Sequence, residues 1–302
     1  MQEDIGTIIN KGFGTLTRNL NICTPFVMSF VLNGLLIAVA FTVFVGFFIV
    51  PEISSAGLDP DIISPEQTIE IFSSVFSEQI WTIVAGFIVI IPLMMLIQSY
   101  FTAGAIGMSK NAAETGNTNL KEMWKSANQN VFNLFLTNIL ILLITLAGIV
   151  FIVPGVLAFE DFNMLLANPT EAANSMILLT IGLLIWMLYI IAVNVMLSIS
   201  EYALVVDKLD PITALEIGFK FFLNNKFDVL FLWMIMVVLS VFISIIGELV
   251  SSVQVFAAIW TFLDLIISIA VIPPLTTIWW TRLLLDRSGR KMYDPTELLM
   301  DF

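Results

Sequence analysis

The chain has 302 residues, of which 59% are hydrophobic and only 12% are charged, and its formal net charge is −12. Soluble domains carry about 25% charged residues, so this composition indicates an integral membrane protein that crosses the bilayer several times. The chain has no histidine, and Cys23 is its single cysteine. An internal disulfide, a zinc site and a histidine general base are therefore excluded.

Six apolar stretches are long enough to span a bilayer, which takes about 20 residues. We predict spans at residues 25–50, 81–103, 131–153, 176–198, 227–246 and 255–280. Pro51 and Pro154 are expected to end the first and third spans, Pro92 to kink the second, and Pro273-Pro274 to break the sixth. The predicted fold class is therefore all-α, a polytopic membrane protein.

Short amphipathic helices are predicted before three of the spans. In the stretch 210–223, Asp210 is a typical N-cap, Pro211 suits the first helical position, and apolar residues follow at helical spacing. The same pattern predicts helices at 3–20 and at 119–130. We expect each of these helices to lie on the membrane surface with its apolar side in the lipid.

A polar joint rich in asparagine follows each predicted surface helix. The joints are Arg18-Asn19-Leu20-Asn21, Asn128-Gln129-Asn130 and Asn224-Asn225. The predicted architecture is therefore three hairpins of spans in one membrane domain over residues 1–302, each preceded by an amphipathic cytoplasmic surface helix. A cytoplasmic tail follows at 281–302. The alternative is that any interfacial helix entering a membrane needs a polar joint, without a true repeat.

All twelve basic residues fall on one side of the membrane under this six-span prediction. Two precede the first span, three lie between the second and third, three between the fourth and fifth, and four follow the sixth. The opposite loops contain no basic residue and ten of the 24 acids. Because loops rich in Lys and Arg stay in the cytoplasm, we predict a multi-pass protein of the plasma membrane with both termini cytoplasmic.

Two stretches resemble motifs of a known six-span membrane family. They are YALVVDKLDPITALEIGFKFFLNNKFDVLF at residues 202–231 and PLTTIWWTRLLLDRSGRK at residues 274–291, and Val153-Pro154-Gly155 resembles a third motif. The family includes the membrane domain attached to some glycerophosphodiester phosphodiesterases, and archaeal and bacterial stand-alone relatives. Thr281-Arg282 stands where a tyrosine is common. The resemblance implies a six-span fold but no catalytic residue, and it does not imply phosphodiesterase activity.

Asp264 is the most informative polar residue, because it lies about midway along the sixth predicted span. A carboxylate at that depth costs at least about 2.5 kcal/mol and usually faces the bundle interior or water. One interpretation is a proton or cation site, with carbonyls freed near Pro273-Pro274 as further ligands. The other is a structural aspartate that holds helices together against Asn194, Asn138 or Gln98. These four polar residues form the candidate intramembrane site.

A second set of charged residues is expected at the cytoplasmic interface. Glu201 lies near the end of the fourth span, and Asp228 lies in the first turn of the fifth, where the helix dipole favours an anion. We expect these carboxylates to pair with Lys208, Lys226 or Arg282. The set is interpreted as interfacial ion pairs rather than as a catalytic group.

The sequence contains no Gly-rich phosphate loop, no His/Cys metal cluster and no nucleophile elbow. We therefore predict no catalytic residue, no cofactor-binding residue, no metal ligand and no cofactor. The expected function is that of a non-enzymatic membrane protein that engages membrane lipids, a protein partner or further copies of itself, and no nucleic acid. The alternative is a small transporter or channel that uses Asp264 and the Pro273-Pro274 break.

Overall fold

The computed structural model describes residues 3–55, 57, 64–158, 173–251 and 254–293, and this part of the chain is helical apart from short connections. Six helical stretches within it are long and apolar enough to cross a membrane: Leu20–Ser55, Gln67–Thr115, Leu120–Phe151, Ser175–Asp207, Lys226–Ser251 and Phe256–Arg287. The fold is therefore that of an all-α, multi-pass membrane protein.

The helices follow one another with few breaks. In chain order they are α1 (Ile5–Arg18), a 3-10 turn (Leu20–Cys23), α2 (Thr24–Phe44), a π-helical segment (Val45–Ile49), α3 (Val50–Ser55), α4 (Pro65–Thr115), α5 (Leu120–Ala147), a 3-10 turn (Gly148–Phe151), α6 (Val153–Leu157), α8 (Ala173–Leu197), α9 (Ser200–Asp207), α10 (Pro211–Asn224), α11 (Lys226–Ser251), α12 (Gln254–Ile266), a π-helical segment (Ile267–Val271) and α13 (Ile272–Arg287).

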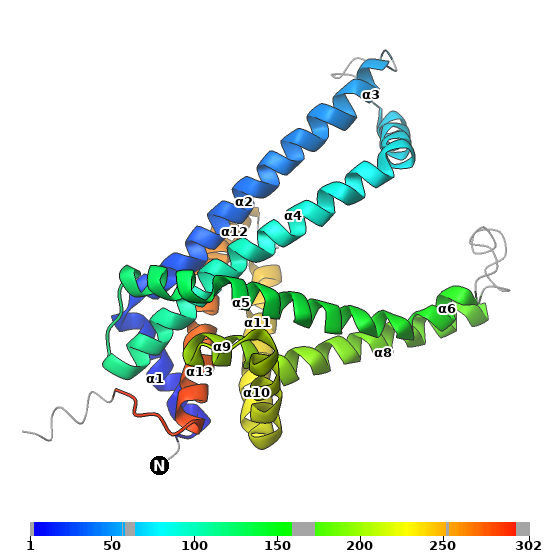
Figure 1. Cartoon of the computed structure of the whole chain (residues 1–302). Coiled ribbons are helices and arrows are strands. Elements are labelled where there is room, and N and C mark those ends of the chain that lie inside the picture. The colour runs from blue at the N-terminus through cyan, green and yellow to red at the C-terminus, as the bar shows by residue number, and fades with distance from the viewer. Residues whose placement is uncertain (1–2, 56, 58–63, 159–172, 252–253, 294–302) are drawn as a thin grey trace, which may run out of the picture.

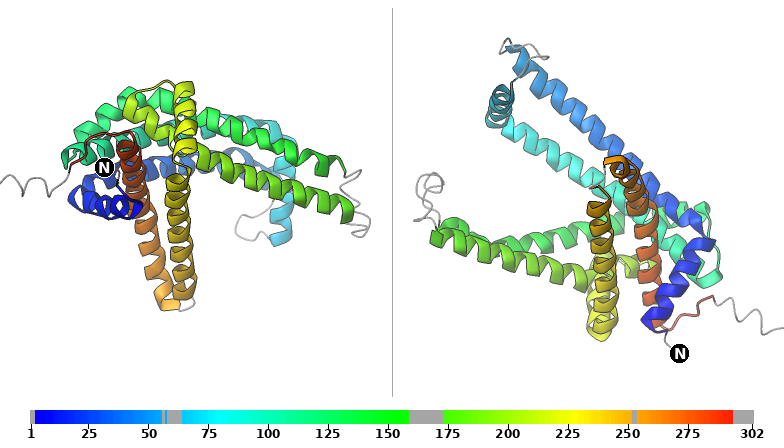
Figure 2. Two further views of the ribbon diagram at one scale, coloured as in Figure 1. Left: turned by 90° about the horizontal axis from the view of Figure 1, so that it is seen from below. Right: turned by 180° about the vertical axis from the view of Figure 1, so that it is seen from behind.

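Three pairs of helices extend from a common centre as arms that point in different directions (Figures 1 and 2). α2 packs against α4 in the first arm, α5 and α6 against α8 in the second, and α11 against α12 in the third. At the centre, α13 packs against α1, α4 and α9, while α5 crosses α4 and contacts α9 and α10. We call this centre, made of α1, α9, α10, α13 and the α4–α5 crossing, the packed end.

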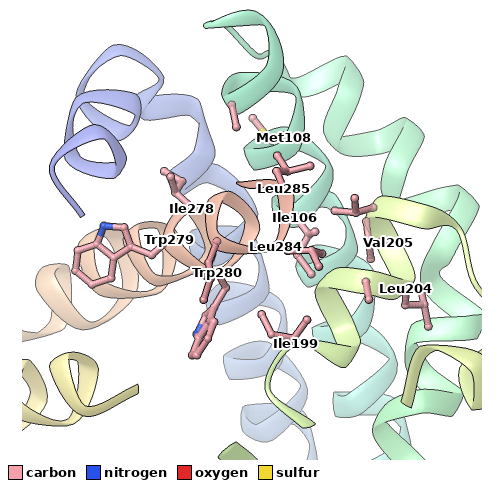
Figure 3. Close-up of a cluster of buried hydrophobic side chains, with 14 of the residues drawn as sticks. Ile106, Met108, Ile199, Leu204, Val205, Ile278, Trp279, Trp280, Leu284 and Leu285 are labelled. Carbon is pink, nitrogen blue, oxygen red and sulfur yellow. The ribbon is translucent and has the colours of Figure 1, made fainter. Parts of the chain in front are cut away.

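α13 is the centre of the packed end. Nearly every side chain from Pro274 to Asp286 is buried, so α13 has no solvent-facing side, as expected of a helix enclosed by protein. Figure 3 shows side chains of α13 meeting those of α4 and of the α8–α9 region in this core. The labelled residues are Ile106, Met108, Ile199, Leu204, Val205, Ile278, Trp279, Trp280, Leu284 and Leu285.

The arms, in contrast, bury few side chains. In the most apolar stretch of each spanning helix, only between 0% and 17% of the residues are buried. Phe41, Trp81 and Leu188 are 66%, 81% and 67% exposed. Leaving such surface in water would cost about 25 cal/mol per Å², so the arms require a lipid environment on most of their surface.

Two of the three predicted asparagine joints are breaks between helices, and the third is not. Asn19 separates α1 from α2, and its buried amide bonds the Gly116 carbonyl at 3.1 Å and the Thr118 N–H at 2.9 Å. Asn225 separates α10 from α11. The joint predicted at 128–130 is wrong, because α5 is continuous there. The Asn130 amide donates to the Ser126 carbonyl one turn earlier instead of ending the helix.

Pro51 and Pro154 behave differently from the prediction. Pro51 does not end a helix, because the helical stretch Leu20–Ser55 continues past it. Pro154 lies in the first turn of α6, where a missing N–H costs nothing. Pro92 lies inside α4 without interrupting it. Just before Pro273-Pro274, where a break was predicted, the π-helical segment Ile267–Val271 changes to α13 at Ile272, and the helical stretch Phe256–Arg287 continues through the two prolines. The predicted tail beyond residue 293 lies outside the described residues.

The contact between α1 and α13 gives a first prediction. A Cβ added at Gly12 would overlap the Trp279 indole, which also donates from Nε1 to the Ile9 carbonyl at 3.2 Å. We expect Gly12→Ala to lower the apparent melting temperature of the purified protein, since overpacking costs about 1–3 kcal/mol.

Gly14→Ala is the matched control on the same helix, because no atom lies within 4 Å of a Cβ added there. That change should leave the melting temperature unchanged or raise it slightly, since alanine favours helix. Equal losses in the two variants would show that α1 does not pack on Trp279 in this way.

Candidate functional site

A network of charged side chains joins the start of the chain to the end of the last spanning helix. Arg282 is 2% exposed, and its Nε and Nη2 donate to the two Glu3 carboxylate oxygens at 2.9 and 2.8 Å. Lys11 Nζ lies 2.8 Å from the same carboxylate. Two parallel bonds from one guanidinium form the strongest and most directional type of ion pair. The pair holds the residues just before α1 against α13.

The network continues through Asp286 and Arg287 to the next spanning helix. The Asp286 carboxylate accepts the Glu3 backbone N–H at 3.1 and 3.2 Å, and it pairs with Arg287. Arg287 donates from Nε to Asp228 at 2.7 Å and from Nη1 to the Glu3 carbonyl at 3.0 Å. The network therefore ties the N-terminal segment, α13 and the first turn of α11 together.

The network has the properties of a structural element rather than of a catalytic group. Taking a charge out of water costs several kcal/mol unless it is paired and hydrogen-bonded, and each of these side chains has such partners. Burial on its own would raise the pKa of the Glu3 carboxyl, but hydrogen bonds and charges from Arg282 and Lys11 bring that pKa below its ordinary value. Glu3 therefore stays ionised and does not exchange protons near neutral pH.

The structure forms different ion pairs from those predicted at the cytoplasmic interface. Asp228 pairs with Arg287, and Arg282 pairs with Glu3, so neither takes the partner expected from the sequence. Lys226 lies over the Phe227 ring, 5.4 Å from its centroid. The predicted interface does hold ion pairs, but the partners of Arg282 and Asp228 are Glu3 and Arg287.

The two remaining residues of the predicted interface lie on α9 and at its end. Glu201 is half-buried, and no described residue donates a hydrogen bond to its carboxylate. Lys208 follows α9 as its C-cap in the left-handed conformation, with φ 55°. Glu201 and Lys208 do not pair with each other, because seven residues, about two helical turns, separate them. Asp228 pairs with Arg287 instead.

Sequence reasoning missed Glu3, Asp286 and Arg287 as members of the network. Glu3 and Arg282 are 279 residues apart, and nothing local in the sequence indicates which of many terminal charges will meet. Only a weak indication of these residues was present in the sequence. Arg282 and Asp286 are one helical turn apart at the end of an apolar stretch, and a buried position there would require a partner for each.

Asp264 lies beside a small cavity between α11 and α12. The cavity has a volume of about 220 Å³ and is lined by Ser240, Ser244, Ser268 and two isoleucines besides the aspartate. Asp264 is half-buried, and no described residue donates a hydrogen bond to its carboxylate. The cavity thus places three hydroxyls and one carboxylate around a space large enough for a small polar ligand.

The other three residues of the predicted intramembrane site do not line this cavity. Gln98 accepts a hydrogen bond from Ser29 of α2 at 3.0 Å. Asn138 of α5 donates to the Ser99 hydroxyl of α4 at 3.1 Å. Asn194 donates to the carbonyl of Ile190 in its own helix at 2.8 Å. The structure therefore does not bring the four residues together, and Gln98 and Asn138 each link two helices.

No family model, curated protein or solved structure matches this chain. The resemblance to the six-span membrane family therefore stays a prediction. The functional conclusion has to come from the geometry of the packed end and the arms.

The network gives a second prediction, on acid stability. Because the pKa of Glu3 is lowered in the folded protein, its ion pair contributes fully above pH 4.5, the ordinary glutamate value, and is lost as the pH falls through the lower folded value. We expect Glu3→Gln to cost about 3 kcal/mol near neutral pH and to make the apparent melting temperature fall less steeply below pH 4.5.

The control for this prediction is Glu216→Gln. The Glu216 side chain is 60% exposed and forms an ion pair with Lys220, which this variant removes. Exposed pairs contribute little, so this variant should follow the wild type over the whole pH range. Parallel acid curves for the wild type and Glu3→Gln would contradict the assignment of the acid-sensitive pair.

Proposed function

We propose that this chain is a non-enzymatic membrane protein of the plasma membrane that engages lipid, with its packed end in the cytoplasm. The observation that carries the proposal is the uneven distribution of burial. Side-chain packing is concentrated at the packed end, whereas the spanning stretches bury at most 17% of their residues. Lipid is then the main contact of the arms, and lipids supply a large part of the molecule's apolar packing.

The distribution of charge supports a cytoplasmic packed end. The twelve basic residues all lie on the described helices and connections of that end or directly beside it. The acids Glu52, Glu70, Glu78 and Glu248 lie toward the far ends of the arms. By the tendency of Lys and Arg to stay on the cytoplasmic side, both termini are cytoplasmic and each arm is a transmembrane hairpin.

The exposed face of α10 supports its role as a surface helix. α10 buries Ala214, Gly218 and Phe221 against the packed end, and its other side exposes Ile212, Phe219 and Leu223, of which Ile212 is 72% exposed. An apolar face that the protein leaves uncovered suits a helix lying in the headgroup region with that face toward the acyl chains. α1 differs from the expectation, because Ile8 and Leu16 are buried in the packed end and the Phe13 ring packs edge-on against Trp279, so its apolar side faces protein.

The proposal predicts a dependence on lipid charge. Each Lys or Arg close to the membrane surface attracts anionic lipid by about 1 kcal/mol. In nanodiscs that contain phosphatidylglycerol, we expect a higher apparent melting temperature than in nanodiscs of phosphatidylcholine alone, and sodium chloride should reduce the difference by screening. Equal melting temperatures in the two lipids would overturn the proposal.

The cavity beside Asp264 favours a second candidate function, that of a small transporter or channel. An unpaired carboxylate at membrane depth is costly and is often functional. The π-helical segment Ile267–Val271 directly follows α12 and changes the pattern of backbone hydrogen bonds beside the cavity. In this candidate function Asp264 would carry a proton or a small cation.

Flux measurements separate the two functions. In liposomes, the lipid-engaging function predicts no proton flux above that of protein-free vesicles. If flux is present, Asp264→Asn should abolish it without lowering the apparent melting temperature. The control is Glu248→Gln, which changes a carboxylate at the far end of α11 that does not line the cavity, and this variant should keep the flux of the wild type. Full flux in Asp264→Asn would remove Asp264 from the mechanism.

A further inference from the structure

A polar cleft lies where α4 and α5 cross, and α9 closes one side of it. Its volume is about 250 Å³. Polar residues dominate its lining, among them Lys110, Asn111, Lys125, Gln129, Asn130 and Lys208. The three lysines come from three different elements, namely α4, α5 and the C-cap of α9. We call this space the lysine cleft.

The lysine cleft keeps hydrogen-bond donors available for a ligand. Lys110 Nζ donates to the Val206 carbonyl at 3.0 Å, and an ammonium carries three N–H donors, so further donors remain. Lys125 lies 3.4 Å from Glu122 at an exposed position. The Lys208 ammonium has no hydrogen-bond partner among the described residues.

The acids in the lining do not cancel this positive charge. Glu122 is the partner of Lys125 at 3.4 Å, and Glu114 lies 4.0 Å from Arg290. Arg290 also pairs with Asp207, next to Lys208. Each carboxylate near the cleft therefore faces a cation, and Lys110 and Lys208 are left with no carboxylate partner among the described residues.

The position of the lysine cleft corresponds to the headgroup region. Tyr100 of α4 and Trp124 of α5 contact each other with ring centroids 5.9 Å apart, and such aromatic residues mark membrane interfaces. Gly107, the first cleft residue of α4, lies two helical turns beyond Tyr100, about 10 Å along the helix. On α5, Trp124 lies between the cleft residues Glu122 and Lys125, so the cleft lies at the level of this aromatic pair.

We propose that the lysine cleft binds a phosphate group, carried by a phospholipid headgroup or by a small soluble phosphate ester. The inference rests on the proposed function, because it places the cleft at a cytoplasmic membrane surface. Lysine ammonium groups bind phosphate oxygens through charge-assisted hydrogen bonds. The cleft is smaller than the roughly 300 Å³ at which pockets for drug-sized molecules begin, a size that suits a phosphate group, and its polar lining does not suit an acyl chain.

The test uses the full-length protein in detergent micelles at constant ionic strength. Isothermal titration measures the affinity for two probes, sodium phosphate and phosphatidylglycerol with eight-carbon chains. The cleft variant is Lys125→Gln with Lys208→Asn, since asparagine tolerates the left-handed backbone of position 208. The control variant is Lys220→Gln with Lys226→Gln, which removes the same charge from positions that do not line the cleft.

We expect the cleft variant to bind about 30-fold more weakly than the wild type, as two charges at about 1 kcal/mol each imply, and the control variant to bind within about twofold of it. Loss of lipid binding in the cleft variant identifies a lipid headgroup as the source of the phosphate. If the lipid does not bind the wild type, and the cleft variant loses the binding of sodium phosphate, the source of the phosphate is a soluble ester.

Two results overturn the inference. One is that neither probe binds the wild type, and the other is that the control variant loses as much affinity as the cleft variant. The proposed function is judged separately by the melting temperatures in nanodiscs. If phosphatidylglycerol stabilises the cleft variant as much as the wild type, the proposed function stands, and the titration with the two probes alone decides the cleft inference.

Discussion

The guanidinium of Arg282 lies in a helix whose neighbours are almost all buried, so it needs a carboxylate at close range. Among the described residues Glu3 supplies this carboxylate, and it reaches Arg282 because α1 lies against α13. Gly12 permits that approach by leaving room for the Trp279 indole. The Arg282–Glu3 pair and the packing of α1 on α13 therefore depend on each other, and α1 covers the last spanning helix.

This arrangement gives the molecule two regions with different packing. At the packed end, α13 is enclosed by α1, α4 and α9, and ion pairs satisfy the charges that packing has buried. In the arms, apolar side chains are left for lipid. In the proposed function, the bilayer surrounds the arms, and the lysine cleft lies at the level of the lipid headgroups. The proposal of a lipid-engaging role rests on this division between a packed end and exposed arms.

The sequence was sufficient for the parts of the structure that depend on local physics. Long apolar stretches predicted the six spanning helices, and Asp210 caps α10 as expected, accepting the Thr213 N–H at 3.1 Å. Tertiary contacts decided the rest. Asn130 continues a helix although it resembles a joint, and Glu3 meets Arg282 across 279 residues. The sequence indicates only that Ser240 and Ser244, one helical turn apart, lie on the same side of α11. Which residues of α12 they face depends on how the two helices pack, and the sequence alone does not predict that.

In the proposed arrangement, lipid contacts a spanning helix of an arm on opposite sides of that helix. Val39 and Phe41 of α2 are 60% and 66% exposed, and two residues of separation place them on opposite sides of a helix. With Cys23 replaced by serine, a nitroxide at position 39 and another at 41 would each report collisions with oxygen dissolved in the acyl chains of a nanodisc. The account predicts high and similar collision rates at both positions. A low rate at one of them would show that the spans close into a compact bundle, which would contradict the account.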